Sequence, residues 1–442
     1  MRRTMVRGAV AVAVAVAVAT AGALVVVGGG PAGAAAVPTL SFSGAQAIAS
    51  PDGGTMTFRA KLSAASASAV SVHYATANGT ALAGTDYVAA SGTLTIAAGG
   101  TSGSVTVTLL PVVLGAGGSN KTFKLDLSHA SGALLSTPSV NGTIHPDVYV
   151  AHTSDVFADV VINPSSTTAF LTVPAKNEVA VLNLRTGTYG KPIPVGSDPQ
   201  GIDITPDGKT LYVCDSGGQT ISKVVIATHK VTTITTPPGS LNNTPLSIAV
   251  MNNGHALYTT TFSGSGFGAI AYNLNLTTDT SAVASNIGIN GLVTEVTPLS
   301  RSSDHSTVGA VLGDDSGGPF DIYTAATGNV VSGSLNAFIS SSSLDGDGST
   351  MLVDGRYVID AATGSLLGTI SDTCGSSALT ATGSTGYCLE QQAIVRLNTG
   401  RFLVSKTIKL PQPTAGGAQL ALSDNGDVLV AETGGGATIV EL

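Results

Sequence analysis

The stretch Gly196–Ile234, GSDPQGIDITPDGKTLYVCDSGGQTISKVVIATHKVTTI, predicts four short strands joined by three turns. The strands are expected at 201–205, 210–214, 220–226 and 231–234. Pro206-Asp207-Gly208 suits the first tight turn, because proline fixes one φ and glycine accepts a positive one. Four antiparallel strands joined in this way form one blade of a β-propeller. A single blade cannot bury both of its faces, so further copies are expected.

The turn after the first strand of this unit recurs along the chain. Its copies are Asn163-Pro164, Thr205-Pro206, Met251-Asn252, Thr297-Pro298, Leu344-Asp345, Ala381-Thr382 and Ser423-Asp424. The positions 164, 206, 252, 298, 345, 382 and 424 are 37 to 47 residues apart, and a four-stranded blade needs about 40–50 residues. Residues 156–442 therefore predict a seven-bladed propeller. The three middle units are degenerate, so that six or eight blades also stay open.

The unit at 196–234 resembles the YVTN family of β-propeller repeats. The matching residues are Val195-Gly196, Pro199, Gly201, Pro206-Asp207-Gly208, Leu211-Tyr212-Val213 and Val225-Ile226. Cys214-Asp215 stands where the family has Thr-Asn. The resemblance extends over about two thirds of the chain and implies the propeller fold. It implies no particular chemistry, because the motif consists of turns and core strands.

The composition fits an all-β chain with short strands. Only 10% of the 442 residues are charged, Gly numbers 55 and Trp is absent. A chain of this length is expected to hold roughly two or three domains. The net charge of −8, without a basic stripe, disfavours nucleic acid and anionic membrane surfaces as partners.

Residues 1–36 predict an export signal. Three arginines precede the apolar run Ala9–Val27, and Ala34-Ala35-Ala36 offers a small-residue cleavage site. The alternative is a retained membrane anchor, since the run is long enough to span a bilayer. We expect cleavage near Val37 and a secreted, extracellular chain without a membrane anchor. The general secretory route is favoured, and the twin-arginine route stays open.

Residues 37–146 predict a β-sandwich. Strands are expected at 55–61, 69–76, 92–96, 103–110, 121–127 and 139–144, separated by closely spaced turns. This segment resembles the Calx-β domain through Val72, Tyr74, Thr76, Gly79-Thr80-Ala81, Gly84, Asp86-Tyr87, Gly92-Thr93-Leu94, Ile96 and Gly99. The pattern continues in Phe123, Leu125, Leu127 and Gly142-Thr143-Ile144. The resemblance implies an immunoglobulin-like sandwich.

The Calx-β resemblance would imply a calcium site made of clustered carboxylates. The corresponding stretches here read Pro111-Val112-Val113 and Gly117–Lys121. Only Asp52, Asp86 and Asp147 remain, whereas Ca²⁺ takes six to eight oxygen ligands. We therefore expect no calcium site and no other cofactor.

The segment 147–155 is expected to link the two domains. Val148–His152 alternates apolar and polar residues, and the last repeat ends at Leu442 after about three strands. Val148–His152 can therefore supply the missing strand and close the ring, which would remove exposed strand edges.

Several other patterns resemble catalytic, metal-binding or disulfide motifs. Gly313–Pro319 resembles the nucleophile loop of trypsin-like proteases, but the matching histidine segment is absent, so we interpret it as a Gly-rich turn. The seven histidines show no metal-ligand spacing, although a site composed from distant blades stays open. Cys374 and Cys388 predict a disulfide in an exported chain. Cys214 is expected to be a buried thiol.

The loops that converge on a propeller's channel mouth are the expected site of function. The candidate ligand-binding residues there are Asp155, Asp198, Gln200, Asn243, Glu295, Asp314, Asp315 and Gln419. The alternative is that the acidic ones are solvated turn residues. No catalytic motif is present, so we expect a monomeric, non-catalytic module that binds a protein or carbohydrate at the cell surface, with the sandwich as spacer or adhesive. The alternative is a lactonase-like or dehydrogenase-subunit-like enzyme.

Overall fold

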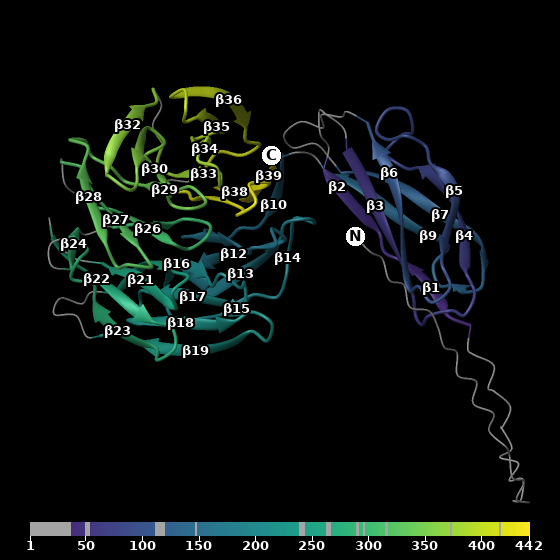
Figure 1. Cartoon of the computed structure of the whole chain (residues 1–442), viewed down its shortest axis with the longest axis horizontal. Coiled ribbons are helices and arrows are strands. Elements are labelled where there is room, and N and C mark those ends of the chain that lie inside the picture. Colours follow the sequence, from purple (N-terminus) through teal and green to yellow (C-terminus); the bar gives the residue numbers. More distant parts are fainter. Residues whose placement is uncertain are drawn as a thin grey trace, which may run out of the picture.

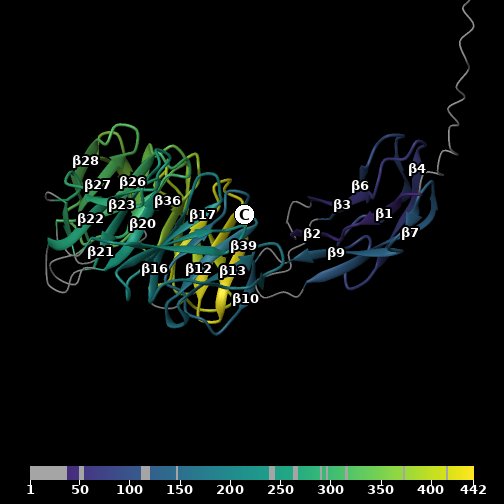
Figure 2. The same cartoon turned by 90° about the horizontal axis from the view of Figure 1, so that it is seen from below.

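The computed structural model describes residues 37–48, 54–110, 120–145, 148–237, 244–261, 267–288, 291–294, 297–313, 317–371, 374–414 and 417–442. Its regular elements are strands, apart from the short 3-10 helix Pro174–Lys176. Within these ranges no helix has the length and apolar character to cross a membrane. The strands form a sandwich followed by a ring of sheets (Figure 1, Figure 2), as the sequence predicted.

The sandwich consists of two sheets with strand orders β6-β3-β1-β8 and β2-β9-β7-β4-β5. In chain order the strands are β1 (Thr39–Phe42), β2 (Ala45–Ile48), β3 (Gly54–Leu62), β4 (Val70–Asn78), β5 (Ser91–Ile96), β6 (Ser102–Leu109), β7 (Lys121–Ser131), β8 (Leu134–Leu135) and β9 (Ser139–His145). In β3, buried and exposed residues alternate, and the inward side chains of both sheets form one core. The rings of Tyr87 and Phe123 stack at its centre, 4.2 Å apart.

Seven sheets lie between Val148 and Leu442 in the described part of the chain, and we name them blades 1 to 7 in ring order. Blade 1 comprises β11 (Val160–Ile162), β12 (Thr168–Val173), β13 (Glu178–Asn183), β14 (Thr188–Tyr189) and β15 (Ile193–Pro194). Blade 2 comprises β16 (Pro199–Ile204), β17 (Thr210–Asp215), β18 (Thr220–Val225) and β19 (Lys230–Thr235). Blade 3 comprises β20 (Pro245–Val250), β21 (His255–Thr260), β22 (Phe267–Asn275), β23 (Thr280–Val283) and β24 (Leu292–Thr294).

The remaining blades repeat the four-stranded pattern. Blade 4 holds β25 (Leu299–Arg301), β26 (Thr307–Val311), β27 (Pro319–Thr324) and β28 (Val330–Ser334). Blade 5 holds β29 (Ser342–Leu344), β30 (Thr350–Val353), β31 (Tyr357–Asp360) and β32 (Ser365–Thr369). Blade 6 holds β33 (Ser377–Leu379), β34 (Thr385–Leu389), β35 (Ala393–Asn398) and β36 (Leu403–Lys409). Blade 7 holds β37 (Leu420–Leu422), β38 (Val428–Thr433), β39 (Gly436–Glu441) and β10 (Val148–His152).

The four strands expected in the segment 196–234 are β16 to β19, with ends within two residues of the prediction. One glycine of that motif has a packing role. A Cβ atom at Gly201 would lie 2.6 Å from the carbonyl oxygen of Leu246 in blade 3. Only glycine therefore lets the first strands of blades 2 and 3 approach so closely.

The turn predicted at Thr297-Pro298 is wrong. These two residues precede β25, and the turn follows it at Ser302, whose hydroxyl accepts the N–H of Thr307 (3.0 Å). In blade 2, Thr205 accepts the N–H of Thr210 in the same way (3.1 Å). The recurring signal is thus a short polar side chain that bonds the backbone five residues later, rather than a proline.

The fourth strand of blade 7 is β10, from the start of the propeller. It pairs antiparallel with β39, from Val148 opposite Val440 to His152 opposite Gly436. Val148 packs on the side of blade 6, and Ala151 on the side of blade 1. Figure 2 shows β10 beside β39. The N-terminal strand of the ring therefore covers the edge that β39 would expose.

Replacing Ala151 by Asp is expected to lower the free energy of unfolding by about 2–3 kcal/mol, because it buries a charge without a partner. Ala151 is fully buried in the structure. His152→Asp, in the same strand but exposed, is the matched control and should have a small effect. Denaturant unfolding at several protein concentrations measures both variants. Equal stability of the two would contradict the closing role of β10.

Candidate functional site

The two ends of the ring differ in their connections. We call one end the disulfide face; it carries the loops between blades and the loops between second and third strands, including Asp155, Asp198, Cys374 and Gln419. We call the other end the arginine face; it carries the turns after first strands, including the turn that follows Arg301. The first strands of the blades lie between the two ends and surround the channel (Figure 1).

The channel contains a cavity of about 250 Å³. Serines are prominent in its lining, which also includes Asp159 and Gln419 toward the disulfide face and Arg301 and Asp424 toward the arginine face. The serines are Ser300, Ser303, Ser340, Ser341, Ser342, Ser343, Ser376, Ser377 and Ser423. A hydroxyl-rich wall of this kind can hydrogen-bond a polar guest, provided that its groups are not used within the protein.

Many of these side chains join one blade to the next. Asp159 of blade 1 accepts the N–H of Ile202 (3.0 Å), and Asp203 of blade 2 accepts the N–H of Val250 (2.7 Å). Further round the ring, hydroxyl pairs or hydroxyl–amide bonds join blades 3–4, 4–5, 5–6 and 6–7. They are Ser247 with Leu299, Ser300 with Ser342, Ser343 with Ser377, and Ser376 with Leu420. The channel wall is thus primarily a structural element.

A buried ion pair crosses the channel near the arginine face. Arg301 Nε lies 2.9 Å from both carboxylate oxygens of Asp203, although the two residues belong to blades 4 and 2. Both side chains are largely buried, with 13% and 6% exposed. The Asp424 carboxylate of blade 7 is 3.9 Å from Arg301 Nη1. One guanidinium therefore connects three blades at this end of the channel.

Buried carboxyl groups with raised pKa values cluster in blades 7, 1 and 2. Burial raises the pKa of Glu432 to about 8, and the nearby charge of Asp159 adds to the effect. Burial likewise raises the pKa of Asp159 to about 7 and that of Asp215 to about 6. One oxygen of Glu432 and one of Asp215 have no hydrogen-bond partner among the described residues. Glu432 therefore favours the protonated form at neutral pH, whereas Asp159 and Asp215 take up protons at a higher pH than ordinary carboxyl groups do.

A second hollow, of about 430 Å³, opens on the disulfide face beside the bond between Cys374 and Cys388. It shares Gly375, Ser376 and Gln419 with the lining of the channel cavity. The rest of its lining comprises Leu389, Glu390, Gln391, Thr414, Gly417 and Ala418. The hollow and the channel are thus neighbouring parts of one recessed region.

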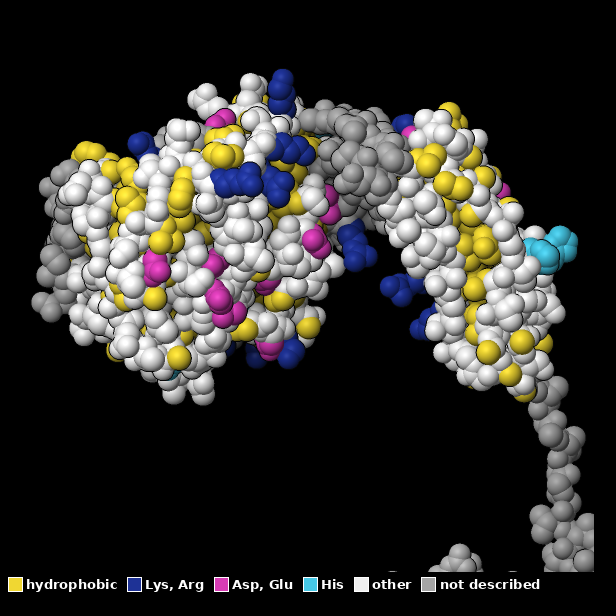
Figure 3. Space-filling model, turned by 45° about the horizontal axis from the view of Figure 1, so that its top comes forward, with side chains coloured by type: hydrophobic (Ala, Val, Ile, Leu, Met, Phe, Trp, Pro, Cys, Tyr) yellow, Lys and Arg dark blue, Asp and Glu magenta, His cyan; other side chains and the backbone are white. Residues whose placement is uncertain are grey.

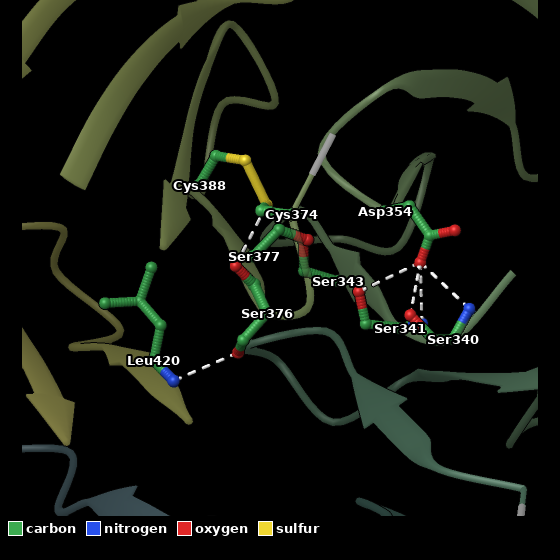
Figure 4. The surroundings of a disulfide bond; sticks show 9 residues. All are labelled: Ser340, Ser341, Ser343, Asp354, Cys374, Ser376, Ser377, Cys388 and Leu420. Carbon is green, nitrogen blue, oxygen red and sulfur yellow. Dashed lines mark hydrogen bonds between the residues drawn. A yellow bond between two sulfur atoms is a disulfide. The ribbon is translucent and has the colours of Figure 1, made fainter. Parts of the chain in front are cut away.

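The disulfide ties the connection between blades 5 and 6, which holds Cys374, to Cys388 in β34 of blade 6. Figure 4 shows Cys374 and Cys388 beside Ser376 and Ser377. In the same figure Asp354 Oδ1 accepts the N–H groups of Ser340 and Ser341, each at 2.9 Å. The loop before β29 is therefore tied to the loop after β30.

Replacing both Cys374 and Cys388 by Ser is expected to lower the stability by roughly 3 kcal/mol, because the 14-residue separation no longer closes a loop in the unfolded chain. Denaturant midpoints with and without a thiol reductant measure the loss. The reductant should shift the wild-type protein and leave the double variant unchanged. An unshifted wild type would show that the bond contributes no stability.

The structure places four of the eight predicted ligand-binding residues. Asp155 pairs with Lys176 (2.6 Å), and this bond lowers its pKa. Asp198 accepts a hydrogen bond from Gln200 at the rim of blade 2 (2.8 Å). Gln419 lines both hollows, and the other three line neither. Asn243, Glu295, Asp314 and Asp315 lie outside the described residues.

The predicted absence of calcium remains a prediction. Asp86 is buried, with its carboxylate 2.5 Å from Lys121 Nζ and 2.8 Å from the N–H of Leu82. Its oxygens therefore already have partners. Asp52, Asp147 and Pro111-Val112-Val113 lie outside the described residues. Among the described residues, no group of three or more His, Cys, Asp or Glu side chains could hold a metal ion.

The comparisons with solved structures show the fold of the ring. Hydrazine synthase of Kuenenia stuttgartiensis is 15% identical, with 65% of this chain and 95% of that chain covered and a TM-score of 0.52. The Cps50 (Swd1) β-propeller domain of Myceliophteria thermophila is 12% identical, with 67% and 99% covered and a TM-score of 0.52. The RRP9 WD40 repeats are 15% identical, with 67% and 97% covered and a TM-score of 0.52.

At these identities the likeness extends to the fold alone. No curated protein shows significant similarity to the chain. Residues 34–141 match the model of the Calx-beta domain, and the described part of that range forms the sandwich. The chain therefore joins a segment that matches the Calx-beta domain to a ring with the β-propeller fold.

Proposed function

We propose that the chain is an exported, non-catalytic binding protein whose disulfide face binds a protein partner. The Calx-beta domain acts as a spacer or adhesive module, and the ring, built from repeats of YVTN type, is the binding platform. Support for the architecture comes from the domain match and from the WD40-like neighbours. Support for export comes from the charged, apolar and small-residue segments of residues 1–36.

Exposed apolar side chains on the disulfide face carry the proposal. Phe338 is 73% exposed and Val156 is 71% exposed, and both lie in loops that join one blade to the next. Phe338 is two residues from Ser340, which lines the channel cavity. An exposed aromatic side chain beside a polar hollow is typical of the anchors that dominate protein–protein binding.

The second hollow on the disulfide face can supply the polar part of such an interface. Gln391, Thr414 and Gln419 offer amide and hydroxyl groups around a recess of about 430 Å³, enough for one side chain of a partner. Among the described residues, its lining includes no aromatic side chain on which a sugar ring could stack. A protein partner is therefore favoured over a carbohydrate.

The enzyme alternative rests on Asp159, whose pKa of about 7 would suit a general base. Its two oxygens accept the N–H groups of Val160 (2.8 Å) and Ile202 (3.0 Å), and the second of these bonds joins blade 1 to blade 2. These bonds favour a structural role for Asp159 over a catalytic one.

A photo-reactive amino acid placed at Phe338 tests the proposal. The full chain is incubated with the culture medium and surface proteins of its producer and then irradiated. We expect a discrete adduct with one protein, and competition by excess unlabelled wild-type chain. The matched control carries the same group at Leu367, which is 53% exposed on the outer strand β32 and should give no such adduct.

Three results would contradict the proposal. An identical adduct from both positions would indicate unspecific contact. An adduct with glycan alone would replace the protein partner by a carbohydrate. Absence of any adduct from Phe338, with an intact and folded chain, would remove the binding role of this face.

A further inference from the structure

Two histidines lie side by side on the outer face of the sandwich. The rings of His73 in β4 and His129 in β7 have centroids 5.5 Å apart and planes at 69°. Both side chains are exposed. Figure 3 shows histidine side chains projecting together from the sandwich surface. Fifty-six positions separate the pair in the sequence (129 minus 73), so no spacing motif reveals it.

A β-bulge creates this arrangement. Ser71 pairs with Ser131 and His73 pairs with Ser128, so β7 carries one residue more than β4 in this interval. In a regular strand His129 would point away from the face that Ser128 and His73 share. Instead, its φ of 50° places it in the left-handed region, which a side chain other than glycine rarely adopts. The bulge thus turns the His129 ring toward His73.

The spacing of the rings suits chelation. Two metal–nitrogen bonds of about 2.1 Å at a tetrahedral angle separate two imidazole centroids by roughly 5 Å, close to the 5.5 Å in the structure. His129 Nδ1 lies 3.1 Å from the Ser128 hydroxyl. A proton on Nδ1 leaves the lone pair of Nε2 to bind a metal. In a ligating histidine the ring nitrogen that does not bind the metal usually donates a hydrogen bond in this way.

We propose that His73 and His129 form a surface site for a divalent late first-row transition metal, of the class of Ni²⁺, Cu²⁺ and Zn²⁺. Imidazole nitrogen suits these ions, whereas Ca²⁺ and Mg²⁺ prefer oxygen. Two protein ligands leave the other coordination positions to water. The strained conformation of His129 is consistent with a functional position, because glycine would form the same bulge without the cost.

Calorimetric titration of the full, untagged chain with Ni²⁺ and separately with Zn²⁺ tests the site. We expect one ion per chain, and at least a tenfold loss of affinity in His73→Ala and in His129→Ala, since a single imidazole cannot chelate. Retention of the untagged chain on a nickel resin should fall in both variants. Addition of millimolar Ca²⁺ should not compete.

Two further variants separate metal binding from folding. His129→Gly retains the left-handed backbone, so it should lose the metal while its thermal midpoint is unchanged or higher. His229→Ala removes another exposed histidine with a φ of 55°, from a blade 2 turn, and should bind like the wild type. Unaltered binding in the His73→Ala/His129→Ala double variant, or an equal loss in His229→Ala, would overturn the proposal.

Discussion

Replacing Arg301 by Met lowers the free energy of unfolding by about 3–5 kcal/mol at neutral pH, because it leaves the buried carboxylate of Asp203 without its counter-charge. The carboxylate keeps only the N–H groups of Ile204 and Val250, at 2.8 and 2.7 Å. Denaturant unfolding of the wild type and the variant at neutral pH measures the loss.

Two controls distinguish a buried pair from an ordinary one. Lys209→Met breaks the pair with Asp207, whose side chains are 77% and 54% exposed, and should cost less than about 1 kcal/mol. Arg301→Met combined with Asp203→Asn should recover more than half of the loss, because no unpaired charge remains. A cost for Arg301→Met as small as that for Lys209→Met would show that the cross-channel pair is not coupled to folding.

Stability of the propeller is expected to fall as the pH rises from 5 to 8.5. The folded-state pKa values of Glu432 (about 8), Asp159 (about 7) and Asp215 (about 6) lie above the ordinary values of 4.5 and 3.8. The folded state therefore binds these protons more tightly than the unfolded state does. The stability that this difference provides is fully present below the unfolded-state pKa and is lost as the pH rises through the folded-state pKa. The combined loss is at most on the order of 8 kcal/mol, since the three folded-state pKa values lie about 3, 2 and 1 units above pH 5 and one unit corresponds to about 1.4 kcal/mol.

Thermal unfolding across this pH range, with wild type and Glu432→Gln, checks the sign and the residue. The variant should match the wild type at pH 5, where Glu432 is protonated in the folded state, and exceed it at pH 8.5. Asp207→Asn is the control, because hydrogen bonds from Thr205 and Lys209 lower the pKa of that exposed carboxyl. Between pH 5 and 8.5 the stability of this variant should fall with pH as steeply as that of the wild type. A flat profile, or one that rises toward pH 8.5, would contradict the expectation.

The sequence predicted those parts of the fold whose signals are local. The alternation in Gly54–Leu62 and the turn at Pro206-Asp207-Gly208 each involve neighbouring residues, so the corresponding strands were predicted almost to their ends. The strands β1, β2 and β8 were missed, because four or two residues are too few to show a period. The turn of the fourth repeat was predicted wrongly at Thr297-Pro298, because the proline was interpreted as its signal. The turn depends instead on the Ser302 hydroxyl.

The functional geometry depends on contacts that no local pattern encodes. Asp203 and Arg301 are 98 positions apart, and their pairing requires the ring to bring blades 2 and 4 around the same channel. The predicted rim residues were chosen from loop position alone, which does not tell an inward side chain from an outward one. Gln419 lines the hollows because it immediately precedes β37, whereas the Asp155 carboxylate pairs with Lys176.

The strand β10 also has a mechanical consequence. It begins three positions after β9 ends at His145, so tension between the sandwich and the ring acts on the ladder from Val148–Val440 to His152–Gly436. Separating β10 from β39 at these five pairs would uncover the edge of β39 and would at the same time free β10 to extend between the sandwich and the ring. A pull on the sandwich and the opening of the propeller are therefore one event, and the closure of the ring sets the resistance of this connection to force.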